Sequence, residues 1–219
     1  MEEFLLPLFP LELVLFPEER LPLHIFEERY KLMVRHCLGE ESKGGAEHEF
    51  GTVLASGQEM RSVGCTARIA EVARRYDDGR MDIIASGLRR FEILFTDDEM
   101  PYLRAGVEFF DDDAGEDVPS PANAQSALNL FLEVMKRLPE SSDTVELPKA
   151  PYQRLSFRVA APLPLELDFK QQLLAMRNED ERLSKLNETL RQMIPRLDWV
   201  IQARAKVGGN GHLRPREKQ

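Results

Sequence analysis

The spacing of apolar residues changes once along the chain, and this change constrains the fold more than any other feature. From Phe4 to about Phe110, apolar residues recur mostly at every second position, with glycine or proline between the runs. This spacing is typical of β-strands that bury one face. From Ala124 onwards, apolar residues recur every three or four positions, as they do on amphipathic helices. The pattern therefore predicts an α+β protein in which a β-rich lobe precedes a helical lobe.

An acidic stretch marks the boundary between these two lobes. Residues 111–117 have the sequence DDDAGED, and Val-Pro-Ser-Pro follows. Ser120 is a suitable N-cap, and Pro121 suits the first position of a helix. The predicted organisation is a β-rich lobe at 1–112, an acidic linker at 113–119, a helical lobe at 120–207 and a flexible basic tail at 208–219.

A β-hairpin is the clearest element predicted in the first lobe. Apolar and polar residues alternate over 66–72 and again over 81–85, and between them Asp78-Gly79 offers the positive-φ turn that a tight hairpin requires. The same alternation at 91–95 and 103–109 predicts two further strands. We therefore expect an antiparallel sheet or a partly closed barrel.

One helix is predicted to interrupt the strands. It is indicated by a single apolar stripe with spacings of four, three and four residues, formed by Phe26, Tyr30, Met33 and Cys37. Gly39 can end this helix. Because Cys37 lies on the stripe and Cys65 in a predicted strand, we interpret both as core residues rather than reactive thiols. His36 faces away from the stripe, so we expect it to be solvated.

Four helices are predicted in the second lobe, over residues 121–138, 152–163 and 168–176 and from Asn178 onwards. Asn178 with Glu181 three residues later resembles a capping box. Pro195 falls within the last helix, where it removes one hydrogen bond and clashes with the preceding turn. A kink or restart is therefore expected at Pro195.

The charge and the cysteine content exclude several classes of function. The 219 residues include 29 Lys and Arg against 38 Asp and Glu, so the formal charge is −9. This sign disfavours nucleic acid and anionic membranes as partners. The two cysteines form no C-x-x-C motif, and we recognise neither a signal peptide nor a membrane-spanning run. We expect a cytoplasmic protein that does not associate with membranes.

Four segments resemble the Lon protease substrate-binding domain, which is the amino-terminal domain of that ATP-dependent protease. They are LPLFPLELVLFPEERLPLHIFEERYKLM at 6–33, GRMDIIASGLRRFEILF at 79–95, PYLRAGVE at 101–108 and LSFRVAAPLPLELDFKQQLLAMRNEDERLSKL at 155–186. The resemblance covers residues 4–195 in order. It implies a PUA-like β pseudo-barrel followed by an α-helical bundle, and it suggests recognition of unfolded or tagged polypeptides.

Motifs for covalent chemistry are missing from the sequence. The chain contains neither G-x-x-x-x-G-K-[ST] nor G-x-S-x-G. Ser184 and Lys185 are adjacent on a predicted helix, where successive side chains diverge, so they do not form a catalytic dyad. Asp111 to Asp113 lack the spacing of a calcium loop and are interpreted as a solvated linker. We expect no enzyme activity, no catalytic residues, no cofactor and no metal, and a Lon-like domain without the ATPase and protease domains.

The densest apolar segment supplies the candidate residues for polypeptide binding. Pro17 and Pro22 cannot donate to a β-ladder, so part of the segment is expected at a sheet edge or loop, where extended peptides can add as strands. The candidates are Leu15, Phe16, Leu21, Leu23 and Ile25. The groove between the lobes is the expected place for a ligand. The expected partners are unfolded or partly folded polypeptides, with a protease or chaperone as a further candidate.

A run of arginines supports an alternative function, RNA binding by a PUA-like lobe. The candidate basic face consists of Arg68, Arg74, Arg75, Arg89 and Arg90. Few aromatic residues lie nearby to stack on bases. We favour the interpretation that these arginines lie on solvated strand faces and pair with Glu71, Asp82 and Glu92.

Overall fold

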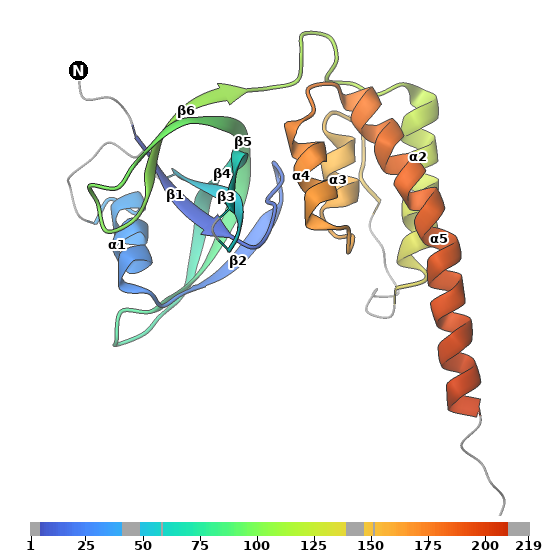
Figure 1. Cartoon of the computed structure of the whole chain (residues 1–219), viewed down its shortest axis with the longest axis horizontal. Coiled ribbons are helices and arrows are strands. Elements are labelled where there is room, and N and C mark those ends of the chain that lie inside the picture. Colours follow the sequence, from blue (N-terminus) through green and yellow to red (C-terminus); the bar gives the residue numbers. More distant parts are fainter. Residues whose placement is uncertain (1–4, 41–48, 58, 139–146, 151, 210–219) are drawn as a thin grey trace, which may run out of the picture.

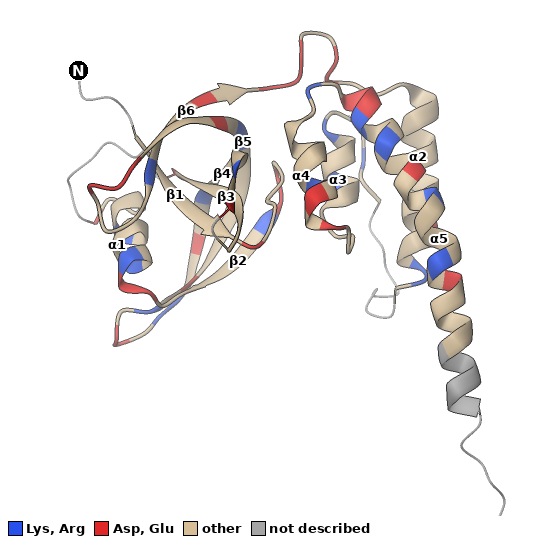
Figure 2. Cartoon of the chain, viewed as in Figure 1, with Lys and Arg blue, Asp and Glu red and all other residues tan. Residues whose placement is uncertain are grey.

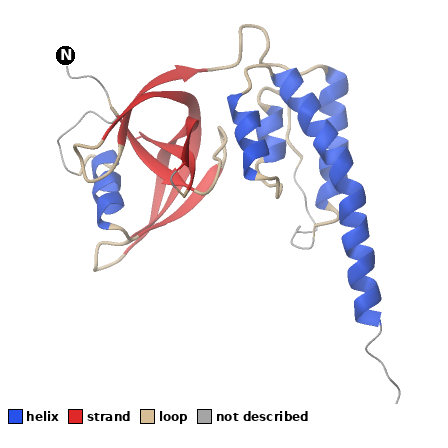
Figure 3. Cartoon of the chain, in the orientation of Figure 1, coloured by secondary structure: helices blue, strands red, loops and turns tan. Residues whose placement is uncertain are grey.

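A computed structural model describes residues 5–40, 49–57, 59–138, 147–150 and 152–209. A β-rich lobe and a helical lobe lie side by side, and strands are confined to the first (Figures 1 and 3). The predicted α+β class is therefore confirmed. In the predicted tail, residues 210–219 lie outside the described residues.

The secondary structure follows the predicted order. The first lobe consists of β1 Leu6–Leu11, β2 Arg20–Ile25, α1 Glu28–Cys37, β3 Glu49–Ser56, β4 Glu59–Arg75, β5 Met81–Asp97 and β6 Arg104–Phe110. The second consists of α2 Pro121–Met135, α3 Leu155–Ala160, α4 Leu167–Ala175 and α5 Glu179–Gly209. Among the described residues, no helix is both long and apolar enough to cross a membrane.

The strands form one six-stranded sheet in the order β2-β5-β4-β3-β1-β6. Because β6 also pairs with β5, the strands β5, β4, β3, β1 and β6 close into a barrel. β1 and β3 run parallel, whereas the other pairs are antiparallel. β2 pairs with residues 81–86 of β5 and is the terminal strand of the sheet.

β4 and β5 are longer than the strands predicted from alternation. Each has 17 residues, and the register between them shifts at three places. Such irregularities bend a strand, which lets β5 pair with β2 at one end and with β6 at the other. The predicted hairpin turn is present, with Gly79 at φ 82° and its N–H donating to the Tyr76 carbonyl oxygen over 2.9 Å.

Helix α1 buries most of the predicted stripe. Tyr30, Met33 and Cys37 are buried, and Gly39 follows the helix at φ 71°. Phe26 was expected on the stripe, but it precedes the helix and is 59% exposed. The helix begins two residues later than Phe26, so the ring lies outside the face that packs on the sheet.

The helical lobe begins and continues largely as predicted. Ser120 caps α2 by accepting the Asn123 N–H at 3.4 Å, and Asn178 caps α5 by accepting the Glu181 N–H at 2.9 Å. Of the two alternatives expected at Pro195, a kink or a restart, the restart does not occur, because α5 continues through this residue. Leu183, Leu186 and Leu190 form the buried side of α5.

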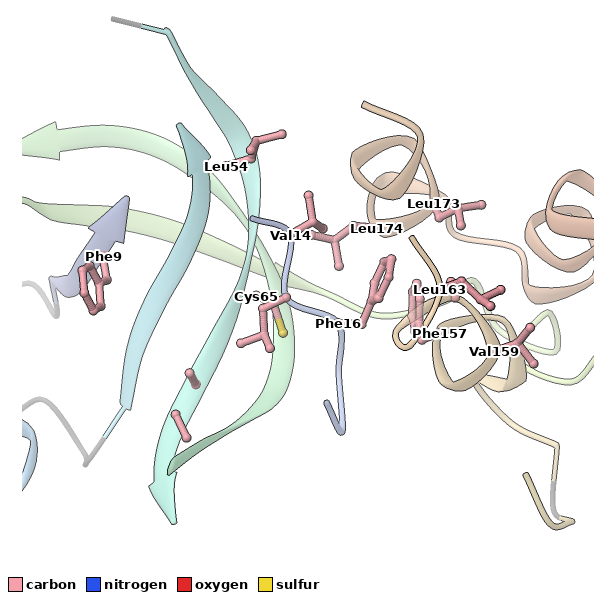
Figure 4. Close-up of a cluster of buried hydrophobic side chains, with 14 of the residues drawn as sticks. Phe9, Val14, Phe16, Leu54, Cys65, Phe157, Val159, Leu163, Leu173 and Leu174 are labelled. Carbon is pink, nitrogen blue, oxygen red and sulfur yellow. The ribbon is translucent and has the colours of Figure 1, made fainter. Parts of the chain in front are cut away.

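One hydrophobic core runs through both lobes. Val14 and Phe16, between β1 and β2, pack in the same cluster as Phe157 of α3 and Leu174 of α4 (Figure 4). The rings of Phe16 and Phe157 stack with their centroids 5.1 Å apart. Gly87 of β5 allows this segment to approach, because a Cβ there would lie 2.1 Å from the Phe16 carbonyl oxygen. The lobes are therefore packed against each other over a buried apolar contact.

Candidate functional site at the junction of the lobes

A buried ion-pair cluster joins the two lobes beside this apolar contact. It consists of Arg90 of β5, Asp112 after β6, Ser156 of α3, and Glu179 and Arg182 of α5. Arg182 donates to both carboxylate oxygens of Asp112, at 2.9 and 2.7 Å, to the Ser156 hydroxyl at 2.7 Å, and to Glu179. Arg90 donates to Asp112 at 2.7 Å. The side chains of Arg182 and Glu179 are fully buried.

The charges of this cluster compensate one another, as buried charges require. Burial alone would raise the pKa of Asp112, but hydrogen bonds and the positive charges of Arg182 and Arg90 outweigh burial and lower it. Burial raises the pKa of Glu179, although Arg182 and Ser156 oppose this shift. Asp112 therefore stays ionised between two guanidinium groups. Asp111 to Asp113 were expected to be a solvated linker. This expectation is wrong for Asp112, whose side chain is only 5% exposed.

An open groove lies where the segment after β1 meets α3, and we call it the apolar groove. It has a volume of about 360 Å³ and is lined by residues 17–20 on one side and by Phe157, Arg158, Ala161 and Pro162 on the other. Ala161 and Pro162 supply an accessible apolar surface above the buried Pro17 and Phe157, and Glu18, Glu19, Arg20 and Arg158 supply two charges of each sign. Such a surface suits a side chain of an extended polypeptide.

Partly buried polar contacts support both walls of the apolar groove. Glu19 accepts the Phe16 N–H at 2.9 Å, and Lys170 of α4 donates to the Ala161 carbonyl oxygen at 3.1 Å. Burial raises the pKa of Glu19, although the hydrogen bond from the Phe16 N–H and the charge of Lys170 act in the opposite direction. Burial lowers the pKa of Lys170, although the negative charge of Glu19 acts in the opposite direction. These contacts hold both walls in place from opposite lobes.

A second groove lies next to the first, and we call it the acidic groove. Its volume is about 550 Å³, and it is lined by Glu18, by residues 111–115, by Asp117, and by Gln153 and Arg154. Figure 2 shows the Asp and Glu residues along the chain between β6 and α2. Glu18 and Arg154 are the two non-glycine residues with positive φ among the described residues, and their side chains lie 3.9 Å apart. Both strained positions therefore lie at the junction of the lobes.

The candidate residues for polypeptide binding separate into two sets. Leu15, Phe16 and Ile25 are buried, at 2, 0 and 1% exposure, so a ligand does not reach them in this conformation. Leu21 and Leu23 are half-buried on β2, the terminal strand. Phe16 is buried because the helical lobe packs on it, and the sequence around Phe16 does not indicate this contact.

The candidate basic face is smaller than predicted. Arg90 is 3% exposed and belongs to the ion-pair cluster rather than to a surface. The other four candidates are exposed but largely engaged. Arg68 and Arg89 pair with Glu49 at 3.0 and 3.6 Å, Arg75 pairs with Glu40, Arg74 stacks over the Tyr76 ring at 4.6 Å, and Arg89 stacks over Phe109 at 3.9 Å. Their carboxylate partners differ from the predicted Glu71, Asp82 and Glu92.

The cysteines and histidines form no reactive constellation in the described part of the chain. Burial raises the pKa of Cys37 and of Cys65 to about 12, in agreement with their interpretation as core residues. His36 was expected to be solvated, but its Nδ1 lies 2.7 Å from the Tyr102 hydroxyl. No group of three or more potential metal ligands occurs among the described residues.

Sequence reasoning missed the α3 side of the junction. Phe157 and Arg158 belong to α3, and Ala161 and Pro162 directly follow it. The apolar pattern of this helix indicated only a buried face, and nothing in that pattern indicates the opposite lobe. The general expectation of a groove between the lobes is met by the two grooves.

A closed barrel followed by a helical bundle, with grooves where they meet, is the architecture of a two-lobe binding domain. The family model of the ATP-dependent protease La (LON) substrate-binding domain matches residues 5–192. The chain therefore belongs to this family. It is 26% identical over 212 residues to the Lon protease of Erwinia amylovora and 24% identical over 216 residues to that of Escherichia coli strain K12. Each alignment covers 94% of this chain but only 27% of the relative.

Solved structures have the same fold. A Lon N-terminal domain protein from Xanthomonas campestris superposes with a TM-score of 0.61 at 25% identity, covering 83% of this chain and 96% of that chain. The N-terminal domain of the Mycobacterium avium complex Lon protease gives a TM-score of 0.57 at 14% identity, covering 85% of this chain and 98% of the other. The chain thus corresponds to about a quarter of the full-length Lon proteases that it matches.

Proposed function

We propose that this protein is a non-catalytic recognition module that binds unfolded or partly folded polypeptides at the junction of its lobes. The observation that carries the proposal is an open groove with an apolar surface in a fold whose family is that of a protease substrate-binding domain. The groove volume of about 360 Å³ lies within the range of about 300–1,000 Å³ typical of ligand sites.

The walls of the apolar groove support binding without a large rearrangement. The stacked rings of Phe16 and Phe157 and the ion-pair cluster fix one lobe against the other. A site that is already formed avoids the free-energy cost of ordering both partners. The terminal strand β2, with half-buried Leu21 and Leu23, lies directly after the residues that line the groove and can extend the contact to a longer chain.

The proposed cellular role is that of an adaptor or holdase in the cytoplasm. The support for an adaptor is that the family is that of a protease substrate-binding domain. We propose an ATP-dependent protease or a chaperone as the protein that receives the bound polypeptide.

RNA binding is the less favoured function. Arg90 is buried, and three of the remaining four arginines pair with carboxylates, which leaves little uncompensated positive charge. A protein that binds RNA through phosphate contacts would lose affinity steeply as salt rises. The proposed contact with apolar side chains predicts a weaker dependence.

The test is fluorescence anisotropy of a labelled polypeptide that is reduced and amidomethylated so that it stays unfolded. We expect saturable binding to this form and none to its folded, disulfide-bonded counterpart or to single-stranded RNA. Ala161→Trp fills the apolar groove and should weaken binding, whereas Ala73→Trp, at an exposed position of β4 that lines neither groove, should not. Far-UV circular dichroism confirms that both variants fold. Equal binding of the folded and unfolded polypeptides would contradict the proposal.

A further inference from the structure

We propose that the junction selects polypeptide segments in which an apolar side chain lies close to Lys or Arg. The apolar groove receives the apolar side chain, and the acidic groove receives the cation. This inference rests on the proposed function, because it names the class of segment that the same site prefers.

The two grooves adjoin at Glu18. Glu18 lines both the apolar and the acidic groove, and its side chain is 56% exposed. The Glu18 N–H donates to the Gly87 carbonyl oxygen at 2.9 Å, which fixes the backbone against β5. A segment of polypeptide that places one side chain in the apolar groove therefore places a neighbouring side chain beside Glu18 and the acidic groove.

The charge of the acidic groove is strongly unbalanced. Five carboxylates and one guanidinium group line it. Asp112 is already neutralised by the buried Arg90 and Arg182, so it contributes little to the attraction of a ligand. The single lining cation, Arg154, is shared between Asp111 at 3.3 Å and Glu18 at 3.9 Å. The remaining two carboxylates, those of Asp113 and Asp117, form no ion pair with Arg90, Arg154 or Arg182.

The acidic segment is held in place rather than free. The Asp113 N–H donates to the Arg177 carbonyl oxygen at 2.9 Å, and the Glu179 N–H donates to the Glu116 carbonyl oxygen at 2.8 Å. Asn178 donates to the Glu116 carboxylate at 2.6 Å. The backbone of the segment is therefore anchored to the start of α5, which keeps its carboxylates at the acidic groove. Fixed charges attract a ligand cation without the entropic cost of ordering the segment.

The apolar groove itself does not select a sign of charge. Its lining holds two acidic and two basic residues, so its net charge is zero. Discrimination between a basic and an acidic neighbour must come from the adjoining acidic groove. An exposed ion pair contributes about 0.2–1 kcal/mol, which corresponds to about 1.4- to 5-fold in affinity for each pair.

The experiment compares labelled peptides of equal length in a Gly/Ser background by fluorescence anisotropy at low and at moderate salt. One carries Leu and Phe followed by two Lys, a second replaces the Lys by Gln, a third replaces them by Glu, and a fourth keeps the Lys but lacks the apolar residues. We expect the first to bind about 2- to 25-fold more tightly than the second, on the basis of two exposed pairs. The third should bind more weakly than the second, and the fourth should not bind measurably.

Matched variants locate the effect. Asp113→Asn with Asp117→Asn removes the two carboxylates of the acidic groove that pair with neither Arg154 nor the buried arginines, and it should make the Lys peptide bind like the Gln peptide. Glu71→Gln with Glu92→Gln removes the same charge from exposed positions of β4 and β5 that line neither groove, and it should leave the preference unchanged. Asp112 is left intact because it belongs to the buried cluster.

The outcomes separate this inference from the proposed function. If the unfolded polypeptide binds, but the Lys, Gln and Glu peptides bind equally or the Asp variants keep the preference, the inference is overturned and the proposed function stands. If the Lys peptide without apolar residues binds as tightly as the first peptide, binding is non-specific attraction and the inference is also overturned. If neither the unfolded polypeptide nor any peptide binds, both fail.

Discussion

Arg182→Met should destabilise the protein by about 3–5 kcal/mol, the cost of removing one partner from a buried ion pair. The methionine fills much of the volume of the arginine but carries no charge. Asp112 retains Arg90 at 2.7 Å, so it stays compensated. Glu179 is fully buried and retains only the N–H and hydroxyl of Ser156, at 2.8 and 2.7 Å. The cost therefore arises from a carboxylate left without a cation.

The pH dependence of this deficit identifies Glu179 as its source. The pKa of Glu179 in the folded protein is already raised by burial, and losing Arg182 removes a charge that opposes this shift. A group with a raised pKa in the folded state stabilises below its unfolded pKa and loses that contribution as pH rises through the folded value. The deficit of Arg182→Met should therefore grow from pH 5 to pH 8. Adding Glu179→Gln should recover about 1–3 kcal/mol at pH 8, because the stranded charge is gone.

The assay is urea denaturation followed by far-UV circular dichroism, since Trp199 is 71% exposed and is a poor reporter of core packing. The matched control is Arg61→Met. Arg61 of β4 pairs with Asp168 of α4 across the same junction at 2.7 Å, but the two side chains are 50 and 73% exposed. The control should cost less than about 1 kcal/mol. Equal costs for the two variants, or a further loss on adding Glu179→Gln, would refute the reasoning.

Three further predictions follow from burial and close packing. Gly87→Ala places a Cβ 2.1 Å from the Phe16 carbonyl oxygen, so it should destabilise by about 1–3 kcal/mol in urea denaturation, and a neutral effect would contradict the packing. Because burial raises the pKa of Cys37 and Cys65 to about 12, iodoacetamide at pH 8 should label neither in the folded protein and both in urea, as read by mass spectrometry. The pKa of Asp112 is lowered, so its contribution to stability is present above the ordinary carboxyl pKa and is lost as pH falls through the folded value. Asp112→Asn should therefore reduce the loss of unfolding free energy as pH falls in the acid range. An unchanged loss would contradict this.

Sequence periodicity located most elements because each lobe buries one side of its strands and helices. The hairpin turn at Gly79 and the caps Ser120 and Asn178 depend on local backbone geometry, which the local sequence determines. The sequence left open whether the helix kinks or restarts at Pro195, because a proline does not show whether neighbouring contacts hold the helix together, and the structure shows that the helix continues.

The junction was not predictable from the pattern of either lobe. Along β5, alternation turns Phe91 towards the barrel and Arg90 outwards, so Arg90 was expected in solvent. In the structure the outward side at this position is covered by the helical lobe, and both residues are buried. The hydrogen-bond partners of the Arg90 side chain lie between 22 and 86 positions away in the sequence, beyond the reach of any periodic signal.

The same reason explains the outcome for the apolar candidates. Leu15 and Phe16 were selected because prolines in the segment excluded it from a central strand, which indicated a sheet edge. The sheet edge was predicted correctly for β2, which is the terminal strand. Phe16, however, precedes β2 and stacks on Phe157 of the other lobe. The accessible part of the site is therefore the adjoining segment at residues 18–20.

Photo-crosslinking from the lining of the apolar groove tests the central claim most directly. A benzophenone amino acid is introduced at position 20, an exposed position that lines the groove, or at position 73 of β4 as the control, and each protein is irradiated with the labelled unfolded polypeptide. We expect crosslinks from position 20 that an excess of unlabelled unfolded polypeptide abolishes, and none from position 73. Efficient crosslinking from position 73 with none from position 20 would contradict the claim that polypeptides bind at the junction of the lobes.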